Sequence, residues 1–116
     1  MQEWLSRAKN IDIEIELLRT EHNTATELLN KYRYKSIYTY RDTLNNRISD
    51  LEAVRNEIIS AIGKVSDSRL QDLLTMRYID GMTWECISEE LYYCYEYVVK
   101  DLHTKALKEI ERVIHI

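Results

Sequence analysis

Apolar side chains recur at alternating spacings of three and four along most of this chain, and almost nothing interrupts them. The 116 residues include no proline and only two glycines, Gly63 and Gly81. Proline and glycine are the strongest helix breakers, and a spacing of three and four keeps side chains on one face of an α-helix. The sequence therefore predicts an all-α fold with long helices, either one domain or one small domain with a helical extension.

The first half contains two apolar stripes of similar length. One stripe consists of Trp4, Ala8, Ile11, Ile15, Leu18, His22, Ala25, Leu29 and Tyr32. The other runs from about Asp42 to Ile62 and consists of Leu44, Ile48, Leu51, Val54, Ile58, Ala61 and Ile62. Each stripe must be buried, so residues 1–65 are expected to form an antiparallel helical hairpin, a possible dimerisation or partner region. Gly63 is expected just past the second helix, with a left-handed backbone.

Between the stripes, residues 31–41 (KYRYKSIYTYR) alternate basic and aromatic side chains. This alternation can serve a nucleic-acid surface, through phosphate contacts and base stacking. It also suits a helix end and a connection whose tyrosines cover the end of the hairpin. Both interpretations stay open. More generally, the nine tyrosines replace the absent phenylalanine, and we expect several of them to be half-buried.

The charge and the cysteines limit the kind of site. The net charge of −4 arises entirely in residues 66–116, with six basic and ten acidic side chains. Because phosphate neutralisation supplies most non-specific affinity for nucleic acid, we expect the second half to bind DNA weakly by itself.

Cys86 and Cys94 lack the spacing of a zinc site, so two half-buried free thiols are expected, with no metal and no cofactor.

No segment indicates a membrane or an export signal. The opening residues, MQEWLSRAKN, have no apolar signal core, and no apolar run approaches the roughly 20 residues of a membrane span. We therefore expect a cytoplasmic protein with no membrane association. The scattered histidines and the lack of a phosphate loop or nucleophile elbow predict that it is not an enzyme.

The second half contains three helical segments with two closely spaced breaks. Ser66, Asp67 and Ser68 offer an N-cap for a helix that presents Leu70, Leu73, Leu74 and Arg77-Tyr78 and ends at Asp80-Gly81. Thr83 caps the next helix, whose buried face is formed by Trp84, Ile87 and Leu91. After a short break, a longer helix begins near Tyr95, with Val98, Leu102, Ala106, Ile110 and Val113 facing inward. This pattern predicts a helix-turn-helix DNA-binding domain over residues 66–116.

The run from Tyr78 to Leu91, YIDGMTWECISEEL, resembles the opening of sigma-factor region 4. In that family, a helix ending Arg-Tyr-x-x-Gly is followed by Thr/Ser-x-Glu-x-Ile-Ala-x-x-Leu. The later Tyr93-Cys94-Tyr95-Glu96-x-Val98 and Leu102-His103-x-x-Ala106-Leu107 extend the likeness over about residues 67–112. The whole chain is similar to small phage-encoded late-gene transcriptional regulators, the RinA and ArpU-like group. The resemblance implies a phage or prophage protein that binds a specific DNA sequence and acts with RNA polymerase.

By this resemblance, the start of the third helix meets base edges and the capping residue of the second helix meets the DNA backbone. The expected DNA-binding residues are Thr83, Tyr95, Glu96, Tyr97, Lys100 and Thr104. Lys105 and Lys108 could extend the positive edge. The chain departs from the family at Tyr92, where glycine, asparagine or histidine is usual, and at Cys94, where the family has serine or threonine.

The expected partners are double-stranded DNA, RNA polymerase and a second copy of the chain, joined through the N-terminal helices into a homodimer. Two other interpretations remain. Small terminase proteins, which package DNA, also join a helix-turn-helix to an oligomerising helical region. Alternatively, the fold persists as a protein-interaction module that has lost DNA binding, which suits the acidic second half.

Overall fold

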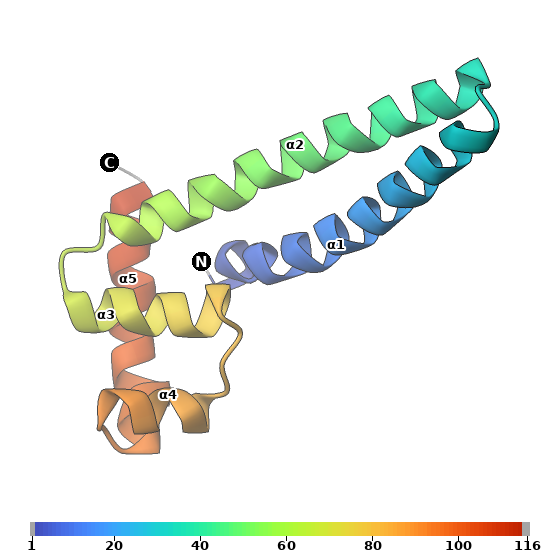
Figure 1. Ribbon diagram of the computed structural model, residues 1–116. Coiled ribbons are helices and arrows are strands. Elements are labelled where there is room, and N and C mark those ends of the chain that lie inside the picture. Colours follow the sequence, from blue (N-terminus) through green and yellow to red (C-terminus); the bar gives the residue numbers. More distant parts are fainter. Residues whose placement is uncertain (1, 115–116) are drawn as a thin grey trace. The chain divides into compact units, whose positions relative to one another are not determined.

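The computed structural model describes residues 2–114, and within them every regular element is a helix (Figure 1). The elements are α1 (Gln2–Lys31), α2 (Lys35–Gly63), α3 (Ser68–Leu74), the π-helical segment η1 (Thr75–Ile79), α4 (Trp84–Leu91), the π-helical segment η2 (Tyr97–Leu102) and α5 (His103–Ile114). The all-α prediction is therefore confirmed. The chain divides into two compact units, Asn10–Arg55 and Met1–Lys9 with Asn56–Ile116, and α1 and α2 contribute to both.

The unit of residues 10–55 is an antiparallel hairpin of α1 and α2, as the paired stripes predict (Figure 1). Its core contains Ile11, Ile15, Ile48 and Leu51, with Leu18 and Val54 packed against them. Ion pairs join the two helices at Arg19–Glu52, Arg47–Glu14 and Arg55–Asp12. The first two pairs are about half exposed and contribute at most about 1 kcal/mol each, while Arg55–Asp12 is partly buried, so the hairpin depends mainly on its apolar seam.

The connection between the two helices is shorter than the sequence suggested. Residues 32–34 form it, and α2 begins at Lys35 rather than near Asp42. The carbonyl oxygen of Tyr34 accepts hydrogen bonds from the backbone N–H groups of Ile37 (3.1 Å) and Tyr38 (3.4 Å) and so starts the helix. With no glycine or proline in this segment, nothing prevents the helix from extending to the turn.

The tyrosines of residues 31–41 keep between 40% and 63% of their surface exposed. Tyr32, Tyr34, Tyr38 and Tyr40 are all exposed, and the rings of Tyr32 and Tyr34 stack on each other at a centroid distance of 6.0 Å. About half of the surface of Tyr32, Tyr38 and Tyr40 is therefore covered, in agreement with the expectation of several half-buried tyrosines. A pocket of about 340 Å³ lies nearby, lined by Thr20, Glu21, Thr24, Ala25, Leu28, Ser36, Ile37 and Tyr40.

The second unit packs the beginning of α1 and the end of α2 with α3, α4 and α5. Its most deeply buried large side chains are Leu5, Ile58, Leu73, Leu74, Ile87, Val98, Leu102 and Ile110. The sequence stripe predicted Trp4 as the inward residue at the start of α1, whereas the structure buries Leu5 fully and Trp4 only partly. The three-and-four repeat follows the hairpin seam from Ile11 onward, whereas residues 2–9 belong to the second unit.

Two predicted N-caps are confirmed. Asp67 caps α3, because its side chain accepts a hydrogen bond from the backbone N–H of Arg69 at 3.0 Å. Thr83 caps α4, because its Oγ1 accepts from the backbone N–H of Cys86 at 3.2 Å. Both satisfy donors that a helix start otherwise leaves unpaired.

The two glycines have different roles. Gly81 adopts φ +70°, and a Cβ atom there would lie 2.7 Å from Nζ of Lys9. Gly63 is the last residue of α2 and does not have a positive φ, so the predicted left-handed backbone is wrong at that position. A tight turn follows Gly63. In it, the N–H of Lys64 donates to the carbonyl of Ala61, and the N–H of Val65 donates to the carbonyl of Ile62.

No helix within residues 2–114 has the length and apolar character needed to span a membrane. Both cysteines, Cys86 and Cys94, are free. Their thiols are exposed, not half-buried as the sequence suggested, because both lie on the outward side of the α4 region.

Candidate nucleic-acid interface

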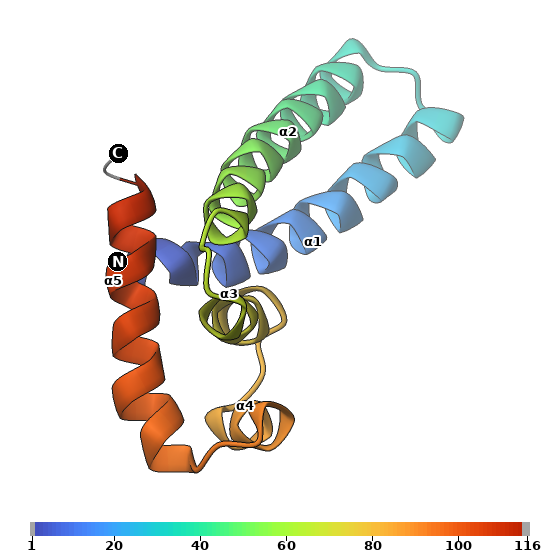
Figure 2. The same cartoon turned by 90° about the vertical axis from the view of Figure 1, so that its left-hand side faces the viewer.

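The α4–turn–α5 region has the geometry of a helix-turn-helix. α4 ends at Leu91, residues 92–94 form the turn, and a continuous helix then runs through η2 and α5 to Ile114. Figures 1 and 2 show α3 and α4 both crossing the long C-terminal helix at steep angles. The predicted inner face is confirmed at its centre, since Val98, Leu102, Ala106 and Ile110 are fully buried.

The turn places a large side chain in a strained backbone. Tyr92 has φ 60° and ψ 35°, the left-handed conformation, and within residues 2–114 it alone among non-glycine residues has a positive φ. The N–H of Tyr92 donates to Glu89 O (3.3 Å) and the N–H of Tyr93 donates to Ser88 O (3.2 Å). These bonds make a Schellman motif, in which glycine or asparagine usually occupies the left-handed position. The tyrosine ring is 93% exposed.

A buried cluster of aromatic and polar side chains joins η1, α4 and α5. Tyr78 Oη lies 2.6 Å from Nε2 of His103, and both residues are buried. The His103 ring meets the Trp84 ring edge-on, at a centroid distance of 4.7 Å. On the other side of Trp84, the guanidinium of Arg77 lies 4.4 Å from the indole centroid and donates to the carbonyl of Met82 at 3.0 Å.

This cluster shifts two pKa values. Burial, and secondarily the charge of Arg77, lowers the pKa of His103 below its usual 6.5. Burial raises the pKa of Tyr78, and the charge of Arg77 opposes that rise only in part. At neutral pH both side chains are therefore uncharged, and one hydrogen bond joins the Tyr78 hydroxyl to Nε2 of His103. The cluster holds the N-terminal half of the long C-terminal helix in position.

The expected DNA-binding residues lie on the exposed side of the helix-turn-helix. Thr83, Tyr95, Glu96, Lys100 and Thr104 are exposed, while Tyr97 is half-buried. The Tyr97 ring is tilted against that of Tyr93, with a centroid distance of 5.3 Å. Tyr97 therefore supports the turn as well as bordering the surface.

The two threonines differ in what their hydroxyl groups can still bind. Thr104 Oγ1 donates to the backbone carbonyl of Lys100 at 2.5 Å, so its proton is already used within the helix. Thr83 Oγ1 accepts from Cys86, which leaves its own proton free to donate to an anion. Thr83 is therefore better suited than Thr104 to contact a phosphate.

The π-helical segment η2 contains two of the expected DNA-binding residues, Tyr97 and Lys100. Here the N–H of His103 donates to the carbonyl of Val98, five residues earlier, rather than to the residue four earlier. Such π turns occur often at functional sites. The wider turn allows both Leu102 and His103 to face the core.

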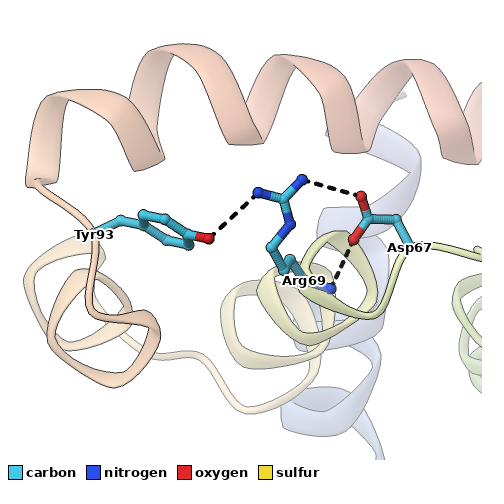
Figure 3. Close-up of polar contacts among 3 residues, drawn as sticks. All are labelled: Asp67, Arg69 and Tyr93. Atoms are coloured by element: carbon cyan, nitrogen blue, oxygen red, sulfur yellow. Dashed lines mark hydrogen bonds and ion pairs between the residues drawn. The ribbon is translucent and has the colours of Figure 1, made fainter.

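Sequence reasoning missed a polar link between the start of α3 and the turn. Arg69 donates from Nη1 to Tyr93 Oη and from Nη2 to Asp67 Oδ2, both at 3.3 Å (Figure 3). The Tyr93 bond, followed by the Asp67 bond, raises the pKa of Arg69, and Arg69 in turn lowers the pKa of Asp67. Arg69 and Tyr93 are 24 positions apart in the sequence, so no local pattern contains this pairing.

Among the described residues, no group of three histidine, cysteine or carboxylate side chains could hold a metal ion. No protein-family model, curated protein or solved structure matches this chain.

Proposed function

We propose that this protein is a sequence-specific, DNA-binding transcriptional regulator, in which the helix that begins at Tyr95 reads the major groove. The observation that supports this function best is the arrangement of Thr83, Glu96 and Lys100. Thr83 caps α4, the helix before the turn. Glu96 and Lys100 are exposed on the first turns of the helix after it. That is where helix-turn-helix proteins make backbone and base contacts.

Each exposed side chain has a definite role in this proposal. Of the two contacts open to Lys100, a guanine or a phosphate, we propose the guanine, and Glu96 accepts from the amino group of a cytosine. The Tyr95 ring is 45% exposed and offers a flat apolar face next to the bases. Thr83 and the backbone N–H groups of the first turn of α4 contact the sugar–phosphate chain.

The acidic balance of residues 66–116 argues against tight binding by one copy alone. We therefore include two partners in the proposal: a second copy, joined through the N-terminal hairpin, and RNA polymerase. The hairpin leaves Ile13, Leu17 and Leu28 exposed on α1. Paired copies would present two reading helices to two half-sites, which compensates for weak binding at each.

The function is tested by titrating the full chain against fragments of the genome that encodes it, over a series of salt concentrations. We expect one or a few fragments to stay bound at salt concentrations that dissociate the others, and the affinity to fall as salt rises. If no fragment is preferred, with or without RNA polymerase, the chain is an interaction module rather than a regulator.

The mass of the protein in solution separates regulation from DNA packaging. A dimer agrees with the proposed regulator. A ring of many subunits would instead identify the chain as a small-terminase-like packaging protein, because such rings surround or collect DNA rather than read paired half-sites.

A further inference from the structure

The positive charge of the second unit is concentrated in a groove between α3 and α5. The groove has a volume of about 420 Å³ and is lined by Ser66, Asp67, Arg69, Leu70, Lys105, Lys108, Glu109 and Arg112. Four of these residues are basic and two are acidic, in a half of the chain that is acidic as a whole. This charge distribution makes the groove the natural place on this unit for an anion.

Lys105 and Lys108 supply the uncompensated charge. Both are exposed, and neither forms an ion pair with any residue between 2 and 114. The other two cations are partly neutralised: Arg69 pairs with Asp67 at 3.3 Å, and Arg112 with Glu109 at 2.7 Å. The carboxylates thus hold the two arginines along the groove, while the two lysines remain free for a ligand.

The spacing of the cations fits a phosphate chain better than a single small anion. Lys105, Lys108 and Arg112 occur at intervals of three and four on one helix, so they share a face. With a rise of about 1.5 Å per residue, they form a row about 10 Å long. The phosphates of one DNA strand rise by roughly 3.4 Å each along the duplex axis, but the strand winds obliquely around that axis, so such a row spans about two successive phosphates.

Arg69 connects the groove to the turn of the helix-turn-helix. Arg69 extends from the start of α3 to the hydroxyl of Tyr93, a residue of the turn (Figure 3). Tyr93 accepts from Arg69 and keeps its own proton for another acceptor. A strand held by the lysine row would therefore lead toward the residues proposed to read bases.

We propose that the groove lined by Arg69, Lys105, Lys108 and Arg112 binds the sugar–phosphate backbone of duplex DNA. This inference deepens the proposed function and rests on it for the identity of the ligand. The groove positions the duplex without reading its sequence, and the start of the C-terminal helix supplies the specificity. This division of roles lets a chain of net negative charge bind DNA through a local positive surface.

The test uses an arbitrary-sequence duplex and the full chain, with fluorescence anisotropy at several salt concentrations. The variant Lys105→Gln/Lys108→Gln removes two charges without changing helix propensity. We expect its affinity at about 50 mM salt to fall at least about tenfold, and the slope of log affinity against log salt to fall by about two. Circular dichroism verifies that the variant remains folded.

The matched control is Lys31→Gln/Lys35→Gln, which removes the same charge from the tyrosine-rich hairpin end. We expect it to change the affinity less than about twofold, within the scatter of surface substitutions. If the control weakens binding and the groove variant does not, duplex binding lies on the hairpin and the inference is wrong. If an acidic polypeptide such as poly-glutamate binds the groove in preference to the duplex, the groove serves a protein partner and the inference is also wrong.

These outcomes separate the groove from the function as a whole. Loss of arbitrary-duplex binding in the groove variant, with no preferred genomic fragment, supports the groove and rejects the regulator. A preferred fragment whose binding is unchanged in the groove variant supports the regulator and rejects the groove. A wild-type chain that binds no duplex at low salt rejects both.

Discussion

Tyr78 Oη and His103 Nε2 lie 2.6 Å apart inside the second unit, where they join η1 to the start of α5. Both residues are buried, and Trp84 and Arg77 pack around them. The contact fixes the position of the helix that begins at Tyr95, so the proposed reading surface depends on it.

Removing the Tyr78 hydroxyl should destabilise the protein. Tyr78→Phe leaves the buried Nε2 of His103 without its hydrogen-bond partner, which costs about 1–3 kcal/mol of unfolding free energy. Tyr40→Phe is the matched control, because it also removes a hydroxyl hydrogen bond, to Glu21 at 2.8 Å, but from an exposed site. Urea unfolding should show a large loss of unfolding free energy for Tyr78→Phe and a loss under about 0.5 kcal/mol for Tyr40→Phe. Equal losses would mean that the buried bond has no special role.

Stability should depend on pH through His103. Its pKa is lowered in the folded protein, mainly by burial, so the unfolded chain binds a proton more readily. The contribution of neutral His103 is therefore complete above about pH 6.5 and is lost as the pH falls from there toward the lower folded pKa. The urea concentration at the midpoint of unfolding should therefore decrease as the pH is lowered from about 8 to about 5.

His103→Gln separates this residue from the other titrating groups. Glutamine can accept from Tyr78 but has no proton to gain in this range. The variant should have a flatter profile than the wild type below about pH 6.5. A wild-type midpoint that rises as the pH falls, or an identical slope in the variant, would contradict the assignment.

Replacing Tyr92 by glycine should stabilise the protein. The left-handed conformation at φ 60° costs a non-glycine residue about 1–2 kcal/mol, and glycine adopts it freely, at an entropic cost of about 0.5–1 kcal/mol. We expect a gain of about 0.5–1 kcal/mol in unfolding free energy. Tyr95→Gly is the control, since Tyr95 is helical and the same substitution should destabilise there. Thermal unfolding that shows the same loss for both variants would rule out strain at the turn.

Gly81→Ala should destabilise the protein and Gly63→Ala should not. At Gly81 the backbone has φ +70°, so strain opposes a Cβ atom there, whereas Lys9 Nζ, 2.7 Å from that Cβ, ends a flexible side chain and can move away. At Gly63 no atom lies within 4 Å of the new Cβ, and the residue is helical. We expect a loss of about 1 kcal/mol or more at Gly81 and no loss at Gly63. A denaturation midpoint unchanged by Gly81→Ala would contradict this assignment.

Local sequence patterns predicted the local parts of the fold. The caps at Asp67 and Thr83 follow from a short acceptor next to an apolar repeat, and the three-residue break after Leu91 follows from the change in that repeat. The inner face from Val98 to Ile110 follows from a spacing of four. Each of these features is determined within one or two helical turns.

Other features depend on which element packs against which. Leu5 rather than Trp4 is fully buried because the start of α1 leaves the hairpin seam and enters the second core. His103 faces inward because η2 has a wider turn than an α-helix, which a regular repeat does not anticipate. The Arg69–Tyr93 link and the basic groove combine residues of α3 with distant ones, so no local pattern contains them.

The central claim is that the helix beginning at Tyr95 reads a DNA sequence. The most direct measurement compares the affinity for the preferred genomic fragment with that for a scrambled duplex, in the wild type, in Lys100→Ala and in the control Lys31→Ala. Loss of a base contact costs about 1–3 kcal/mol, so Lys100→Ala should lower the ratio of the two affinities about tenfold, whereas Lys31→Ala should leave it unchanged. An unchanged ratio in Lys100→Ala, or a wild-type ratio near one, would contradict the claim.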